Sequence, residues 1–262
     1  MTKVRLDHLL AQRGMFSTRN RAAASVLAGE VRLGPERRRA AKPGQLVADD
    51  ELIDVAEAPE FVSRGGRKLA NALAATGIPV AGRRGLDVGA STGGFTDCLL
   101  KRGAAHVVAV DVAYGELHWK LRNDPRVTVL ERCNARGLTP AKLPYAPDLI
   151  VLDVSFIGLE KVLPAVLACA APEFDCLALC KPQFEVGRAR VGKGGVVRDA
   201  GARRDALMGV ARAAQRLGAS VLGFESSGLP GPKGNLETFV WLGDRGRDGV
   251  DDLEAAVRAV EP

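Results

Sequence analysis

The chain has 262 residues, of which 47% are hydrophobic and 26% are charged, as is typical of a globular protein with a substantial core. No apolar run reaches the roughly 18 residues that a membrane span needs, and the first residues lack the apolar segment of a signal peptide. We therefore expect a cytoplasmic protein without a membrane partner. The five cysteines contain no CxxC pair and the three histidines show no ligand spacing, so we expect no metal site.

The charge is unevenly distributed, although the net value is only +6. Residues 1–48 contain ten basic and three acidic side chains, whereas every charged residue in 49–60 is acidic. A concentrated positive charge favours binding to a phosphate backbone. The candidate RNA contacts in this segment are Arg5, Arg19, Arg21, Arg37, Arg38, Arg39 and Lys42.

The first segment has the pattern of a small α+β domain. Residues 5–13 show helical spacing before Gly14, and a second helix is expected from Ser17 or Thr18 to Ala28. Short strands are expected at 31–33, 45–47 and 52–55. We place this domain at residues 1–58, followed by a linker at residues 59–63, where Pro59 interrupts regular structure.

Residues 64–262 alternate between strands and helices, which predicts an α/β domain with a mainly parallel sheet. The segment at 226–237 is rich in glycine and proline and lacks the helix that a parallel crossover usually needs, so the last strand should be antiparallel. The result is a Rossmann-like, seven-stranded methyltransferase sheet rather than a dinucleotide-dehydrogenase sheet. Its strands are expected near 85–89, 106–111, 127–131, 148–153, 176–181, 220–226 and 237–242, and its helices near 66–76, 94–102, 115–122, 158–170 and 200–217.

A glycine-rich turn between the first strand and its helix indicates a nucleoside-cofactor site. Asp111, at the end of the next strand, can accept hydrogen bonds from a ribose, and Asn134 can contact an adenine. Asp87 precedes the turn and would repel a diphosphate, so the methyl donor S-adenosylmethionine is favoured over NAD. The expected cofactor residues in and before the turn are Asp87, Gly89, Ala90, Ser91, Thr92, Gly93 and Gly94.

Four charged residues are predicted to meet at one edge of the sheet. Asp153 and Lys181 end the fourth and fifth strands, and Glu237 begins the antiparallel seventh strand, which puts it at the same edge. Lys68, on the helix before the first strand, can reach that edge too. Charges at strand ends are usually solvated, but four that converge beside a cofactor favour catalysis.

Other residues have less specific patterns. The segment 181–204 is basic and glycine-rich, typical of a solvated loop or of a loop that clamps RNA phosphates. Phe156 could pack on the cofactor or in the core with equal plausibility, whereas Trp119 and Trp241 are expected in the core. The candidate RNA contacts outside the first domain are Arg64, Arg67, Arg188, Arg190 and Lys193.

Several motifs resemble those of the TlyA family, the hemolysin-like rRNA cytidine 2′-O-methyltransferases: SRGGRKL, GASTGGFTD, VLDVSFI, CKPQFEVG, GGVVRD and LPGPKGN. The catalytic part is similar to FtsJ-type 2′-O-methyltransferases, whose Lys–Asp–Lys–Glu tetrad matches Lys68, Asp153, Lys181 and Glu237. Residues 3–60 resemble the RNA-binding domain named after ribosomal protein S-four. The usual Val-Asn-Gly-like turn of that domain is replaced here by residues 32–35 and the arginine run.

The resemblance implies methyl transfer from S-adenosylmethionine to a cytidine ribose 2′-hydroxyl in 23S and also 16S rRNA, within ribosomal subunits. Lys181 is the candidate general base, with Lys68 as the open alternative, because a lysine crowded by another lysine and shielded from water gives up its proton more easily. We assume a monomer. The alternatives are a membrane-active hemolysin, an inactive ribosome-assembly factor and, last, a nicotinamide oxidoreductase.

Overall fold

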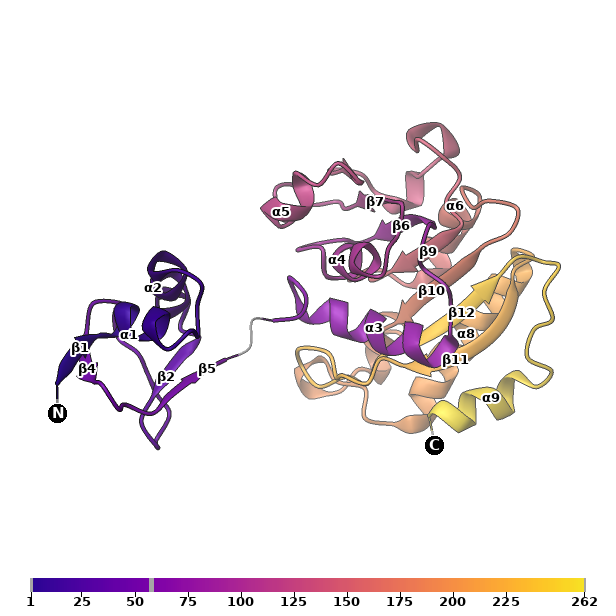
Figure 1. Cartoon of the computed structure of the whole chain (residues 1–262). Helices are drawn as coiled ribbons and strands as arrows, with labels where there is room; N and C mark the ends of the chain where they lie inside the picture. The colour runs from indigo at the N-terminus through magenta and orange to yellow at the C-terminus, as the bar shows by residue number, and fades with distance from the viewer. Residues whose placement is uncertain (1, 57–58, 262) are drawn as a thin grey trace. The chain divides into compact units, whose positions relative to one another are not determined.

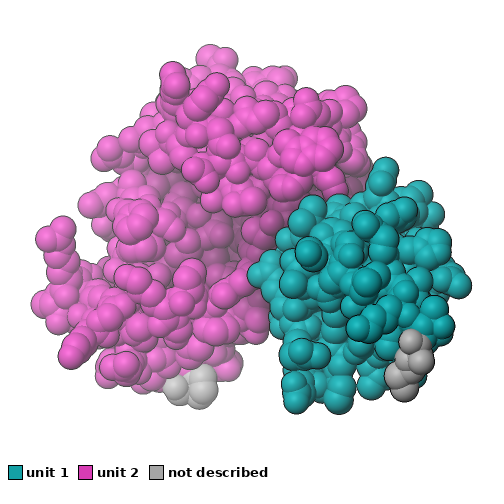
Figure 2. All heavy atoms as spheres, turned by 90° about the vertical axis from the view of Figure 1, so that its left-hand side faces the viewer, with its two compact units in different colours: residues 1–60 teal, residues 61–262 magenta. Residues whose placement is uncertain are grey.

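The computed structural model describes residues 2–56 and 59–261. The chain forms two compact units, residues 1–60 and residues 61–262, coloured separately in Figure 2. The expected domain ends at residues 1, 58 and 262 lie outside the described residues.

In the first unit, the described residues 2–56 and 59–60 contain two helices and five short strands. Its helices are α1 (Leu6–Gln12) and α2 (Arg19–Ala28), and Thr18 caps α2 by accepting a hydrogen bond from the Arg21 N–H. Antiparallel pairing joins β1 to β4, and joins β2 to both β3 and β5. The strands are β1 (Lys3–Arg5), β2 (Val31–Leu33), β3 (Arg38–Arg39), β4 (Leu46–Ala48) and β5 (Ile53–Val55), of which β1 and β3 were not predicted.

The second unit is built on a seven-stranded sheet with the order β11-β12-β10-β9-β6-β7-β8 (Figure 1). The predicted antiparallel seventh strand is confirmed: β12 lies between β10 and β11 and runs antiparallel to both. The remaining neighbouring strands of this sheet pair in parallel. The strands are β6 (Arg84–Val88), β7 (His106–Val110), β8 (Val127–Leu130), β9 (Leu149–Leu152), β10 (Asp175–Cys180), β11 (Ser220–Ser226) and β12 (Thr238–Gly243).

Helices cover both faces of this sheet because successive strand residues point to opposite sides. In β9, Ile150 and Leu152 face one apolar core, whereas Leu149 and Val151 face the other. The first core contains residues of α6 (Leu163–Leu167), α8 (Ala200–Arg216) and α9 (Leu253–Val260). The second contains residues of α3 (Arg64–Thr76), α4 (Gly94–Lys101) and α5 (Trp119–Arg122).

Some predicted helices differ in the structure. The helix expected at 115–122 is only α5, because the chain before it turns through Gly115, which has a φ of 78°. The helix expected at 158–170 is divided into a 3-10 turn and α6, with a proline at the start of α6. Neither α7 (Pro182–Glu185) nor α9 was predicted. The 3-10 segments are Ala135–Gly137, Pro140–Lys142, Leu159–Lys161, Arg188–Arg190 and Lys193–Gly195.

None of the helices in residues 2–56 and 59–261 has both the length and the apolar character to cross a membrane. Within the same ranges, no group of three or more His, Cys, Asp or Glu side chains is arranged to hold a metal ion.

Candidate active site

The glycine-rich turn connects β6 to α4 at the carboxyl edge of the sheet. Gly89 has a φ of 86°, and a Cβ atom there would lie 2.7 Å from the carbonyl oxygen of Asp153, at the end of the adjacent β9. A larger residue would collide with this backbone and would be strained. The turn is thus pressed against the strand end that carries a predicted catalytic carboxylate.

Asp87 lies under this turn and is fully buried. Its Oδ2 accepts hydrogen bonds from the Thr96 N–H at 2.9 Å and the Thr96 hydroxyl at 2.7 Å. Its Oδ1 is also buried but has no hydrogen-bond partner. Burial, supported by the nearby negative charges of Asp153 and Asp111, raises the pKa of Asp87 to about 7. A hydrogen-bond donor would stabilise such a buried oxygen, and a cationic donor would also favour the ionised carboxylate over its protonated form.

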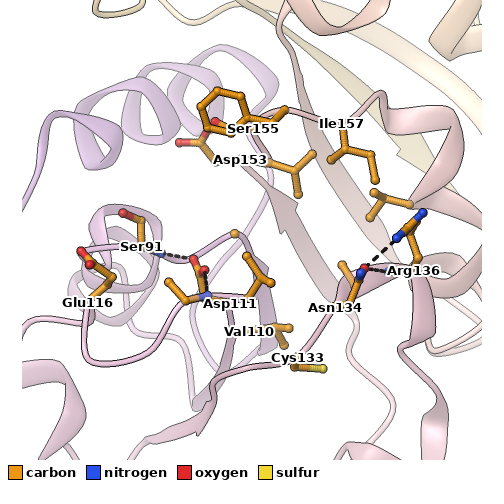
Figure 3. A pocket seen from close by; sticks show the side chains of 17 residues that line it. Ser91, Val110, Asp111, Glu116, Cys133, Asn134, Arg136, Asp153, Ser155 and Ile157 are labelled. Atoms are coloured by element: carbon orange, nitrogen blue, oxygen red, sulfur yellow. Dashed lines mark hydrogen bonds between the residues drawn. The ribbon is translucent and has the colours of Figure 1, made fainter.

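A cavity of about 480 Å³ opens beside the turn, between the ends of β6, β7 and β9 (Figure 3). Asp111 lines it, and its carboxylate accepts the N–H groups of Ser91 at 2.7 Å and Ala113 at 2.8 Å. Asn134 lines the opposite part, where its Oδ1 accepts the Arg136 N–H at 3.1 Å. Gly89, Ser91, Asp153 and Phe156 line this cofactor cavity too, as do Glu116, Cys133 and Arg136, which were not predicted.

A second cavity, of about 420 Å³, adjoins the first and contains all four predicted catalytic residues. Lys68 forms an ion pair with Glu237, and both side chains are buried. Lys181 lies 2.6 Å from Asp153 Oδ1 and donates a hydrogen bond of 2.9 Å to the Ser155 hydroxyl. The catalytic cavity therefore contains two lysine–carboxylate pairs, and Asp153 and Ser155 line both it and the cofactor cavity.

The backbone explains this convergence. Asp153 and Lys181 directly follow the parallel strands β9 and β10, and Glu237 directly precedes the antiparallel β12. The turn before Glu237 is held by the buried Asn235, whose Oδ1 accepts the Val197 N–H at 2.9 Å and whose amide donates to Gly195 O at 2.8 Å. Asn235 thereby ties the basic loop before α8 to the strand that carries Glu237.

A third cavity, of about 350 Å³, adjoins the catalytic cavity and shares Lys181 and Glu237 with it. Phe156 and Phe184 contribute to its lining, with ring centroids 5.3 Å apart. Phe156 is 92% exposed and has a φ of 65°, so of its two alternatives the core position is wrong, and the contact with the cofactor stays a prediction. An aromatic side chain is thus presented at the entrance to both the cofactor cavity and this third cavity.

Comparison with known families agrees with this geometry, since the FtsJ-like methyltransferase model matches residues 61–244. The chain belongs to the FtsJ-like methyltransferase family. Membership implies that S-adenosylmethionine is the methyl donor. The nicotinamide-oxidoreductase alternative is thereby set aside.

Relatives identify the branch of the FtsJ-like family. A Mycobacterium tuberculosis protein named 16S/23S rRNA (cytidine-2′-O)-methyltransferase TlyA is 53% identical over 92% of this chain and 90% of its own length. The Campylobacter jejuni protein named 23S rRNA (cytidine-2′-O)-methyltransferase TlyA is 36% identical over 69% of this chain and 70% of its own. A solved Streptococcus thermophilus structure named as a hemolysin is 38% identical, with a TM-score of 0.74, covering 99% of this chain and 96% of its own. The predicted TlyA resemblance is confirmed.

The residues of the FtsJ-like domain suit S-adenosylmethionine. Asp87 offers a buried oxygen without a partner, which fits the ammonium group of the methionine part. Asp111 uses both carboxylate oxygens for backbone N–H groups, and each oxygen keeps a lone pair for a ribose hydroxyl. Of the predicted turn residues, Gly89 and Ser91 line both cavities and Ala90, Thr92 and Gly94 line the catalytic cavity, whereas Gly93 lines neither.

The predicted RNA-binding residues of the first unit are exposed, and several also pair with acids. Arg5 and Arg19 both form ion pairs with Asp7, at 2.8 and 3.2 Å. Arg37 pairs with Asp54, and Arg38 lies 3.8 Å from Glu36. Arg21 donates to the Ser17 hydroxyl at 3.3 Å, and Arg39 and Lys42 are exposed.

The RNA-binding candidates of the second unit are exposed as well, and one of them lies at the catalytic cavity. Arg64 lines that cavity and donates a hydrogen bond of 2.9 Å to Pro230 O. Arg67 is exposed on the same helix. Arg190 pairs with Asp205 at 2.8 Å, whereas Arg188 and Lys193 are exposed on the loop before α8.

Sequence reasoning missed some contributors and misplaced others. Ser155 and Asn235 lie inside the motifs VLDVSFI and LPGPKGN, but a single sequence gave no reason to single them out. Thr96, the partner of Asp87, lies in the first turn of α4, two residues after Gly94. The core position expected for Trp119 is wrong, because this side chain is 65% exposed. Trp241 is partly buried in β12 and donates to Asp175 at 3.0 Å.

Proposed function

We propose that this protein transfers a methyl group from S-adenosylmethionine to the ribose 2′-hydroxyl of a cytidine in ribosomal RNA. The observation that carries the proposal is the pair of lysine–carboxylate contacts in one cavity next to the cofactor cavity. The names of the TlyA relatives support rRNA and cytidine as the substrate, and the 16S/23S name of the more similar of the two supports both ribosomal RNAs as substrates. A substrate of this kind would be met in the cytoplasm, on ribosomal subunits.

Lys181 serves as the general base in this proposal. A ribose hydroxyl is a weak nucleophile until its proton is removed, so a base within hydrogen-bond reach accelerates the transfer. Lys181 Nζ takes this proton as the hydroxyl oxygen accepts the methyl group that the cofactor would supply. Asp153 and Ser155 hold the Lys181 Nζ in place, at 2.6 and 2.9 Å. Glu237 orients the Lys68 ammonium group, with which it forms a buried ion pair in the same cavity.

The bound cofactor supplies an electrophilic methyl group on a cationic sulfur. Asp87 would hold the amino group, Asp111 the ribose and Asn134 the adenine, and the turn from Gly89 to Gly94 would bind the methionine part. Phe156 stands between the cofactor cavity and the third cavity. The third cavity shares Lys181 with the catalytic site, so we assign it to the target nucleotide.

The first unit supplies RNA affinity in this proposal. Its exposed arginines and Lys42 match a phosphate backbone, as expected of the S-four-like domain proposed for residues 1–58 with a linker at 59–63. Arg64, Arg67, Arg188, Arg190 and Lys193 contact phosphates next to the catalytic cavity. We propose that the protein acts as a monomer. The reaction needs no metal ion in this proposal, because a lysine base activates the hydroxyl directly.

The deciding experiment incubates the protein and labelled S-adenosylmethionine with purified 30S and 50S subunits, and maps methylated riboses by mass spectrometry. Methylation at a cytidine 2′-oxygen in both subunits is expected. Methylation of one subunit alone would contradict the proposal that both ribosomal RNAs are substrates, and would leave the proposed transfer to a ribose 2′-hydroxyl standing. No transfer despite cofactor binding would favour an inactive assembly factor, and leakage of dye from liposomes by the same preparation would favour a hemolysin.

A further inference from the structure

Two aromatic side chains face solvent beside the cofactor cavity without forming part of it. Tyr114 is 67% exposed and Trp119 is 65% exposed. They lie on the segment between β7 and β8, of which α5 is labelled in Figure 1. Ala113 and Glu116 of this segment line the cofactor cavity, but neither aromatic ring lines that cavity, the catalytic cavity or the third cavity. Cofactor binding and core packing therefore leave both rings unexplained.

Each ring carries a cationic neighbour. The Arg132 guanidinium carbon lies 4.4 Å from the centroid of the Tyr114 ring, and Lys120 Nζ lies 5.9 Å from that of Trp119. The His118 ring is stacked on Trp119, with centroids 6.1 Å apart. We call these five residues the Tyr114–Trp119 surface. Aromatic faces alternating with cations suit a partner that has both flat rings and negative charge.

A single carboxylate holds this surface in place. Glu131 accepts the Gly115 N–H at 2.7 Å, next to Tyr114, and also forms a two-point ion pair with Arg122, one helical turn after Trp119. The His118 N–H donates to Thr92 O at 3.1 Å, which attaches the start of α5 to the glycine-rich turn. The rings are thus presented by ordered backbone, and binding to them would lose little conformational entropy.

We propose that unpaired bases of the substrate RNA stack on Tyr114 and Trp119. Single-stranded RNA is recognised by stacking on aromatic rings and guanidinium planes, with cations neutralising the phosphates. Lys120, Arg132 and Arg136, between β7 and β9, are exposed cations, whereas Glu116 is an exposed acid beside them in sequence. This excess of positive charge favours a polyanion over an apolar or basic protein partner. This inference rests on the proposed RNA substrate and adds a further place of contact, apart from the target nucleotide and the proposed phosphate contacts.

The test uses protein-free 16S and 23S rRNA and the full chain. Each base–aromatic stack contributes about five- to a hundredfold in affinity, so Tyr114→Ala and Trp119→Ala should each weaken binding by such a factor. The salt dependence should stay unchanged, because stacking displaces no counterions. Tyr114→Phe and Trp119→Phe should keep near-normal affinity. Leu217→Ala, which truncates an exposed apolar side chain after α8, should have no effect.

Tryptophan fluorescence provides a direct readout of stacking, since the chain has only Trp119 and Trp241. RNA should quench the wild type, and the quenching should be absent in Trp119→Phe. Calorimetry should find cofactor binding unchanged in all four Tyr114 and Trp119 variants, because the rings lie outside the cofactor cavity.

Three results would overturn the inference. One is unchanged affinity of both alanine variants for protein-free rRNA. Another is weakened binding to intact subunits alone, which would point to a ribosomal protein. A wild type that methylates subunits but does not bind protein-free rRNA would also overturn it and leave the proposed function standing. If the wild type neither binds nor methylates any rRNA, the proposed function fails as well.

Discussion

Lys68 and Glu237 are 169 positions apart in the sequence and form a buried ion pair inside the catalytic cavity. Lys68 comes from α3 and Glu237 from the start of β12, so the contact exists only when the antiparallel strand is in place. The second lysine, Lys181, has a separate carboxylate partner in Asp153. Each lysine therefore has its own counter-charge.

Breaking the Lys68–Glu237 pair should be costly for the fold. Lys68→Met leaves the buried Glu237 carboxylate without its cation, and we expect a loss of about 3–5 kcal/mol in the free energy of unfolding, measured with urea. Adding Glu237→Gln should restore most of the stability but no methyl transfer. As a control, Arg258→Ala removes the exposed pair with Glu254 and should cost less than about 0.5 kcal/mol. A double variant that regains activity would rule out a catalytic role for this pair.

Removing the proposed base should abolish activity without unfolding the protein. Lys181→Ala is expected to lower the rate of methyl transfer about a hundredfold to ten-thousandfold, the usual contribution of a general base. Cofactor affinity should remain largely intact. Double variants within the set of four should lose less than the sum of the single losses. Near-normal turnover of Lys181→Ala on intact ribosomal subunits would contradict the mechanism.

The ionised Asp87 carboxylate should lower the free energy of unfolding and raise the affinity for the cofactor. Its pKa of about 7 lies above that of an unfolded aspartate, so the unfolded chain loses this proton first and stability falls as pH rises from about 4 to 7. Asp87→Asn keeps an acceptor for Thr96 and should stabilise the protein at pH 8 by on the order of 3 kcal/mol. S-adenosylmethionine affinity of the wild type should rise through pH 7 as the carboxylate ionises, and should be weak in the variant at every pH.

The exposed Asp251→Asn serves as the control for Asp87 and should change neither stability nor affinity. Thermal unfolding and calorimetry between pH 5 and pH 9 measure both quantities. If Asp87→Asn bound the cofactor as well as the wild type does, Asp87 would not be the partner of the amino group.

Asp111 should determine affinity for the ribose part of the cofactor. Asp111→Ala removes two acceptors for the ribose hydroxyls and also the anchor of the Ser91 and Ala113 N–H groups. Calorimetry should give clearly weaker S-adenosylmethionine binding. Asp111→Asn, which keeps one acceptor oxygen, should lie between the alanine variant and the wild type. Tight NADH binding without S-adenosylmethionine binding would refute the cofactor assignment.

The arginine run should contribute through phosphate contacts. Neutralising Arg37, Arg38 and Arg39 together should weaken rRNA binding and reduce its salt slope by about one unit per lost contact. Because Arg37 and Arg38 already have acidic neighbours, Asp54 and Glu36, we expect a loss below three units. The same binding isotherms at several salt concentrations provide the measurement. An unchanged slope would mean that this turn is only solvated.

The sequence alone determined the architecture that carries the site. Strand–helix alternation predicted the sheet, and a glycine- and proline-rich link without a helix predicted the antiparallel β12. Because β12 is antiparallel, its first residues lie at the edge of the sheet where the parallel strands end. This predicted that Glu237 lies at the same edge as Asp153 and Lys181. These features depend on local pattern and connection length, which one sequence contains.

Only the tertiary structure decided the pairing and burial of individual side chains. In the structure, Lys68 pairs with Glu237, and Lys181 pairs with Asp153. One oxygen of Asp87 is buried without a hydrogen-bond partner, and the side chains of Phe156 and Trp119 are exposed to solvent. The identity of an acidic or aromatic residue in the sequence does not show whether its side chain is buried or solvated. Its surroundings come from segments distant in the sequence, and desolvation and ion pairing therefore depend on contacts that local periodicity does not encode.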